Sequence, residues 1–79
     1  MFKVILPALS EGIEKATISF WYHKEGEQIN KDEDLVELVT DKAVFNLPSP
    51  CSGIIREIFF KEGQTVDIGE VIALIEEEK

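Results

Sequence analysis

The residue best placed to do chemistry is a lysine, Lys42, which lies between two runs of strand-forming residues. Residues 35–39 and 44–47 are rich in β-branched and apolar side chains, which fit a half-buried pleated surface. Because so few residues separate the two runs, they predict an antiparallel hairpin. Its tip is Asp41-Lys42, where a side chain extends into water.

The tip lacks glycine, although two-residue hairpin loops favour glycine at positions of positive φ. Asp41 can bond nearby backbone N–H groups, whereas lysine has no turn preference of its own. We therefore expect a type I turn and a reason for keeping Lys42 there. A solvated lysine is protonated at neutral pH and is a weak nucleophile. Lys42 is thus predicted to be an attachment point that another enzyme modifies, with an ordinary surface lysine as the alternative.

The remaining inventory argues against an enzyme. The 79 residues make one domain and contain one histidine, His23, and one cysteine, Cys51. They cannot supply a disulfide, a complete zinc site or a nucleophile–base pair, so no metal and no catalytic residue is predicted. The net charge of −8 disfavours nucleic acid and anionic membranes and favours a partner with a basic surface. No membrane-spanning stretch or leader is evident, so we expect a cytoplasmic protein, or a mitochondrial matrix protein if a leader was removed.

Many short strands with frequent turns predict an all-β sandwich or barrel. Besides the hairpin, strands are expected at residues 2–6, 16–22, 28–30, 53–60, 65–67 and 71–75. Alternation along the second strand would place Ile18, Phe20 and Tyr22 on one face and Trp21 on the other. The near-continuous apolar run at 53–60 predicts a strand covered on both faces. Residues 76–79 are expected to begin a linker.

The two halves of the chain resemble each other. Lys24-Glu25-Gly26 recurs as Lys61-Glu62-Gly63, 37 residues later, and beyond the next turn the predicted spacing is 36, with one residue lost in that turn. This alignment matches Asp41-Lys42 to Glu77-Glu78. It predicts two similar sheets related by a pseudo-two-fold axis, with the hairpin tip and the chain's exit at opposite ends.

Taken together, the motifs resemble the lipoyl domains of E2 acyltransferases from 2-oxo acid dehydrogenase complexes, over essentially the whole chain. The matching segments are 6–13 (LPALSEGI), Trp21, 24–27 (KEGE), Asp41-Lys42-Ala43, and 48–50 (PSP) with Gly53. The resemblance implies a flattened barrel or sandwich of two four-stranded antiparallel sheets spanning residues 1–79. It also implies that Lys42 carries lipoic acid in amide linkage, with Asp41 and Ala43 as motif flanks. The loop Ala8, Leu9, Ser10, Glu11, Gly12, Ile13 and Glu14 would lie near this lysine and help the E1 decarboxylase recognise the domain.

The resemblance also implies the partners. A lipoate ligase or lipoyl transferase would modify Lys42, and the arm would be acylated at E1, which uses thiamine diphosphate. It would pass the acyl group to coenzyme A at the E2 catalytic core and be reoxidised by the FAD enzyme dihydrolipoamide dehydrogenase, E3. The domain itself would be a carrier with no catalytic residue. The loop sequence mixes features of several members, so the 2-oxo acid stays open.

Three alternatives remain open at this point. A biotinyl carrier domain also modifies a hairpin lysine, but its usual flanks are methionines and here they are Asp41 and Ala43. A glycine-cleavage carrier protein is lipoylated as well, but it is longer and has helical segments. An unmodified β-module would bind a partner through the loop that contains Leu9 and Ile13.

Overall fold

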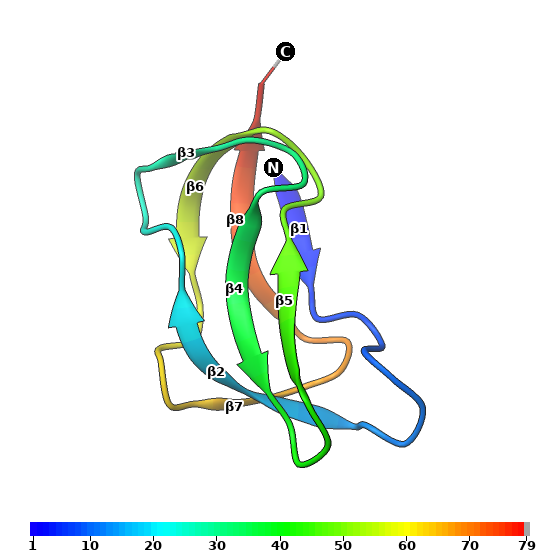
Figure 1. Cartoon of the computed structure of the whole chain (residues 1–79). Helices are drawn as coiled ribbons and strands as arrows, with labels where there is room; N and C mark the ends of the chain where they lie inside the picture. Colours follow the sequence, from blue (N-terminus) through cyan, green and yellow to red (C-terminus); the bar gives the residue numbers. More distant parts are fainter. Residues whose placement is uncertain (79) are drawn as a thin grey trace.

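The computed structural model describes residues 1–78 and contains two four-stranded antiparallel sheets (Figure 1). Its strands are β1 Phe2–Ile5, β2 Lys15–Trp21, β3 Gln28–Ile29, β4 Asp34–Val39, β5 Val44–Pro48, β6 Gly53–Ile58, β7 Thr65–Asp67 and β8 Val71–Glu77. The strand orders are β1-β8-β6-β3 and β5-β4-β2-β7. Replacing each strand of the first sheet by the strand four places away in sequence gives the second sheet. The predicted all-β fold with internal pseudo-two-fold symmetry is therefore confirmed, as a sandwich in which the sheets do not close into a barrel.

The hydrogen-bonded registers correct the predicted spacing of the repeat. Corresponding cross-strand pairs are Ile18–Leu38 and Ile55–Ile75, then Trp21–Val36 and Ile58–Ala73, all 37 residues apart. No residue is lost after the turn, so the spacing of 36 was wrong. The position equivalent to Asp41 is therefore Glu78, and the position equivalent to Lys42 is Lys79, which lies outside the described residues.

A β-bulge overturns the predicted faces of β2. The register shifts between Ile18 and Phe20, so the simple alternation is reversed beyond that point. Ile18 and Trp21 consequently both enter the core, whereas Phe20 is 47% exposed. Trp21 is anchored there by donating its indole N–H to Phe60 O at 2.9 Å. The equivalent bulge in β6 lies between Ile55 and Glu57.

The core lies between the two sheets and takes residues from both halves. Its fully buried large side chains include Leu6, Ile18, Ile29, Leu35, Val36, Leu38, Ile55, Val66, Ile72 and Ile75. The prediction that 53–60 is covered on both faces was wrong, because β6 ends at Ile58 and Phe59 is 44% exposed. The last strand was predicted to end at residue 75, but β8 continues to Glu77, since Glu76 and Glu77 pair with Ile54 and Gly53; the start of a linker in this region stays a prediction. Glu78 follows β8, and Lys79 lies outside the described part of the chain.

The tip of the β4–β5 hairpin lies at the opposite end of the molecule from the start of β1 and the end of β8 (Figure 1). At the tip end, the two halves differ. Phe2 in β1 corresponds to Phe45 in β5, a spacing of 43, whereas the strands that follow are spaced by 37. The connection from β1 to β2 is therefore six residues longer than the one from β5 to β6. This extra length is the loop that reaches the lysine.

Candidate functional site: the lysine at the hairpin tip

The hairpin turn is closed by a side chain. Thr40 N donates to Ala43 O at 2.9 Å, and the Thr40 hydroxyl donates to the same oxygen at 2.8 Å. The hydroxyl oxygen in turn accepts from Lys42 N at 3.2 Å and from Ala43 N at 3.0 Å. Neither Asp41 nor Lys42 has positive φ, which excludes the type I′ turn. Sequence reasoning missed Thr40, although a threonine one residue before a glycine-free turn is a recognisable signal for such hydroxyl bonding.

Lys42 stands at the surface, and its side chain reaches back to the β1–β2 loop. The ammonium donates to the backbone oxygen of Glu11 at 3.3 Å. Gly12 lies beside it with a φ of +82°, and a Cβ built there would lie 2.8 Å from Lys42 Nζ. The missing side chain therefore makes room for the amine. The lysine is exposed, in contact with a backbone oxygen, and open to a second protein.

The predicted recognition loop sits next to this amine. Ile13 is buried and Leu9 is half-buried against the core, so the two apolar residues hold the loop down. The other predicted residues of the loop, namely Ala8, Ser10, Glu11, Gly12 and Glu14, are exposed. Ile13 N donates to Ser10 O at 3.2 Å, which forms a tight bend at Glu11 and Gly12. The structure thus brings the loop and Lys42 together, on the same end as the motif flanks Asp41 and Ala43.

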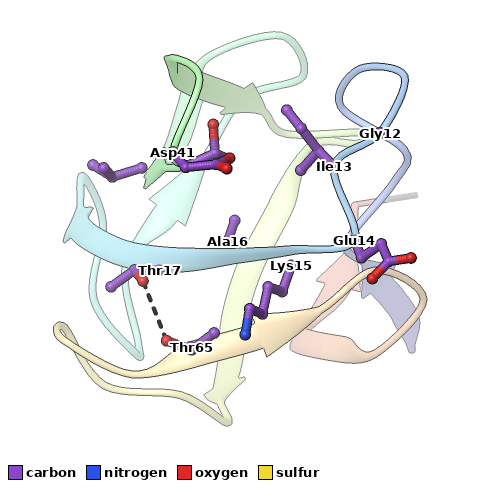
Figure 2. Close-up of a pocket in the computed structure, with 10 residues that line it drawn as sticks. Gly12, Ile13, Glu14, Lys15, Ala16, Thr17, Asp41 and Thr65 are labelled. Carbon is purple, nitrogen blue, oxygen red and sulfur yellow. Dashed lines mark hydrogen bonds between the residues drawn. The ribbon is translucent and has the colours of Figure 1, made fainter.

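A shallow hollow separates the loop from the hairpin (Figure 2). Gly12, Ile13 and Glu14 line one side, and Val39, Thr40 and Asp41 line the other. Its floor is formed by β2 with Thr65 of β7, where the hydroxyls of Thr17 and Thr65 lie 3.2 Å apart. The hollow is open to solvent, and its lining includes Asp41, which precedes Lys42 in the chain, and Gly12, which lies beside the Lys42 amine.

The two other reactive side chains lie away from the tip. His23 Nδ1 is 3.6 Å from a carboxylate oxygen of Glu27. Cys51 is half-buried in the β5–β6 connection, where desolvation, with a smaller contribution from the Glu77 carboxylate, raises the pKa of its thiol. Over residues 1–78, no group of three or more His, Cys, Asp or Glu side chains is arranged to bind a metal ion. The same residues include no helix long and apolar enough to cross a membrane.

Comparison with known proteins agrees with this geometry. A family model described as "Biotin-requiring enzyme" matches residues 3–75. The succinyltransferase component of the 2-oxoglutarate dehydrogenase complex from Rickettsia bellii is 43% identical over 75 residues, which cover 95% of this chain and 19% of that protein. The acetyltransferase component of the pyruvate dehydrogenase complex from Corynebacterium glutamicum is 43% identical over 74 residues, which cover 94% of this chain and 11% of that protein. The chain therefore spans a fifth or less of the length of these relatives.

Solved structures give the same result. The lipoyl domain of the 2-oxoglutarate dehydrogenase complex from Azotobacter vinelandii matches with a TM-score of 0.81 and 33% identity, covering 100% of both chains. Urea carboxylase from Kluyveromyces lactis matches with a TM-score of 0.74 but 16% identity, covering 95% of this chain and 6% of that one, which shows the fold alone.

Two pseudo-symmetric sheets with a lysine at an exposed hairpin tip define a small carrier domain. The chain belongs to the biotin/lipoyl family and is a lipoyl domain of the type found in E2 acyltransferases of 2-oxo acid dehydrogenase complexes. The predicted resemblance is thereby confirmed, and the lipoyl type is favoured over the biotinyl type.

Proposed function

We propose that Lys42 carries lipoic acid through an amide bond and that the domain presents this arm to the active sites of a 2-oxo acid dehydrogenase complex. The observation that carries the proposal is the exposed amine of Lys42 at the hairpin tip, in a chain of this family. When bound, the lipoyl group supplies a dithiolane that accepts acyl groups and reducing equivalents. The residues of this chain supply a fixed root for that arm.

The surroundings of Lys42 fit such an amide. Acylation removes the positive charge of the ammonium, and the amine's hydrogen bond to the loop is to the neutral backbone oxygen of Glu11. An amide nitrogen keeps one N–H, so it can still donate to an oxygen acceptor. No buried carboxylate loses a partner, because the only buried polar residue among residues 1–78 is Ser49. Modification therefore leaves the folded domain undisturbed.

We infer that the parent is an E2 acyltransferase, because the relatives that match over 94–95% of the chain are succinyl- and acetyltransferase components. These relatives belong to two different complexes, so the proposal names the class of complex and leaves the 2-oxo acid open. The parent would work in the bacterial cytoplasm, because the two E2 relatives described above are from bacteria.

The partners we assign are a lipoate ligase or lipoyl transferase, the thiamine diphosphate enzyme E1, the coenzyme A-binding E2 core, and the FAD enzyme E3. The surface supports protein partners, because a net charge of −8 favours association with basic faces. The exposed loop residues Glu11 and Glu14 add negative charge at the lysine end. A tether at the opposite end would leave Lys42 free to meet several enzymes and would raise its effective concentration at each.

Intact mass spectrometry after incubation with a lipoate ligase, ATP and lipoate tests the proposal. The wild-type domain should gain one lipoyl group, Lys42→Arg should gain none, and Lys31→Arg, a surface lysine in another turn, should behave as wild type. Lipoylation of Lys42→Arg, or modification of the wild type by a biotin ligase and not by the lipoate ligase, would overturn it.

A further inference from the structure

Thr40 supplies most of the hydrogen bonds that shape the turn around Lys42. Its hydroxyl makes three contacts within the turn, to Lys42 N, Ala43 N and Ala43 O, at 3.2, 3.0 and 2.8 Å. The Ala43 N–H, which closes the turn, reaches the hydroxyl of Thr40. One backbone bond, from Thr40 N to Ala43 O, also holds the turn, whereas these three contacts pass through a side chain that a single substitution can remove.

No residue at the tip has a conformational preference that would fix the turn without the Thr40 hydroxyl. Asp41 and Lys42 have negative φ, and the tip contains neither glycine nor proline to fix its shape. Elsewhere in the described chain, four glycines have positive φ in turns, namely Gly12, Gly26, Gly63 and Gly69. The hairpin tip is shaped by a hydroxyl instead.

The internal repeat supplies an independent comparison. Ile18–Leu38 corresponds to Ile55–Ile75, so the position equivalent to Thr40 is Glu77. Glu77 lies in β8, pairs with Gly53 and forms no turn. The two halves therefore differ at this position, because a threonine precedes the hairpin tip that bears Lys42 and a glutamate lies within β8.

From this geometry we propose that Thr40 is a positioning residue for the modification of Lys42. The proposal rests on the proposed function, because it assumes that Lys42 is lipoylated. A base on the ligase takes a proton from the ammonium, and the neutral Nζ attacks an activated lipoyl carboxyl, so that a C–N bond forms. The activating group leaves with its electron pair, and the nitrogen gives up a second proton to the base or to water, which leaves an amide with one N–H. Alignment of the two reacting groups governs such a step, and small displacements cost large factors in rate. The Thr40 hydroxyl fixes the backbone from which Nζ extends.

The test compares lipoylation kinetics of Thr40→Val, which replaces the hydroxyl by a methyl group, with Thr40→Ser, which keeps the hydroxyl. We expect kcat/KM of the ligase to fall about tenfold or more for Thr40→Val and to stay within about threefold of wild type for Thr40→Ser. Ser52→Ala is the matched control, because its hydroxyl accepts from Lys31 N at 2.8 Å in the β5–β6 connection and takes no part in the turn at Lys42. It should be modified at the wild-type rate.

A second readout separates positioning from general stability. The Tm of each variant is measured, and the assay is run well below the lowest value, so that every variant is folded. Amide exchange of Lys42 and Ala43 should be faster in Thr40→Val and near wild type in Thr40→Ser, because both N–H groups donate to the hydroxyl. Thr40→Ala offers the same test should Thr40→Val not fold.

The two proposals fail in different ways. A wild-type domain that no lipoate ligase modifies overturns the proposed function. If the ligase modifies the wild type and a folded Thr40→Val with equal kcat/KM, the role of Thr40 is overturned but the proposed function is not. Loss of modification in both Thr40→Val and Thr40→Ser overturns it as well, because the hydroxyl would then not be the group that matters.

Discussion

The backbone N–H of Trp21 donates to the carboxylate of Glu62 at 3.1 Å, across 41 residues of sequence. Its pseudo-symmetric counterpart is the donation from Ile58 N to Glu25 at 2.7 Å. Each half of the chain thus uses the glutamate of its Lys-Glu-Gly turn to bind the long strand of the other half. The repeated motif, seen in the sequence without an assigned role, links the two sheets.

We predict that Glu62→Ala and Glu25→Ala both destabilise the domain, and that Glu62→Ala costs more. The N–H of Trp21 is part-buried, so removing its acceptor leaves an unpaired donor away from water, at a cost of about 1–3 kcal/mol. The bond between Ile58 N and the Glu25 carboxylate lies at an exposed position, so water can replace the carboxylate. Urea denaturation measures the free energies of unfolding. The reverse order, or an unchanged free energy in Glu62→Ala, would contradict this account.

Gly12→Ala should change the surroundings of the Lys42 amine, whereas Gly63→Ala, at a similar positive φ, should not. Gly12 and Gly63 have φ of +82° and +94°, where alanine is strained, so each substitution should cost about 1 kcal/mol. Only Gly12 has Lys42 Nζ within 2.8 Å of the added Cβ, whereas nothing lies within 4 Å at Gly63. Gly12→Ala should therefore shift the Lys42 resonances, including those of its side chain, in NMR spectra. Gly63→Ala is the control and should leave them unchanged.

Core substitutions should follow the observed burial and not the apolar run seen in the sequence. Ile55 is fully buried and its neighbour Ile54 is only partly buried, although both lie in β6. Ile55→Val should cost about 0.5–1.5 kcal/mol, and Ile54→Val clearly less. Thermal denaturation of the two variants checks this order. Equal losses would show that both faces of β6 are covered, as the run 53–60 suggested.

Much of the fold could be predicted from sequence because its signals are local or repeated. β-branched runs, turn glycines and the recurrence of Lys24-Glu25-Gly26 at Lys61-Glu62-Gly63 define the strands and the two-fold plan. What could not be predicted depends on single-residue irregularities. The bulge after Ile18 reverses the faces of β2, and nothing in the residue types marks it. The same holds for the site. Lys42 can be predicted because it lies at the tip of a hairpin that the sequence reveals, whereas its contact with Glu11 depends on how the longer β1–β2 loop folds.

The turn register at Lys42 should itself limit modification. Inserting one residue between Lys42 and Ala43 breaks the donation from Ala43 N to Thr40 and moves the amine relative to Glu11. The tip contributes no residue to the buried core, so the fold should persist while lipoylation falls strongly. Circular dichroism and intact mass spectrometry measure the two effects on one sample. Full lipoylation of the insertion variant would show that the ligase tolerates a displaced lysine.

Cys51 gives a pH-dependent prediction, because burial, with a smaller contribution from Glu77, raises the pKa of its thiol. Only the thiolate is alkylated, so iodoacetamide should react with the folded domain at a midpoint pH above that of the urea-unfolded chain. A pKa raised on folding favours the native state below the unfolded pKa, and this contribution is lost as the pH rises through the folded pKa. Glu77→Gln should lower the folded midpoint without bringing it down to the unfolded value, since desolvation remains the larger cause. Coinciding midpoints for the folded and unfolded wild type would contradict the half-buried placement of this thiol.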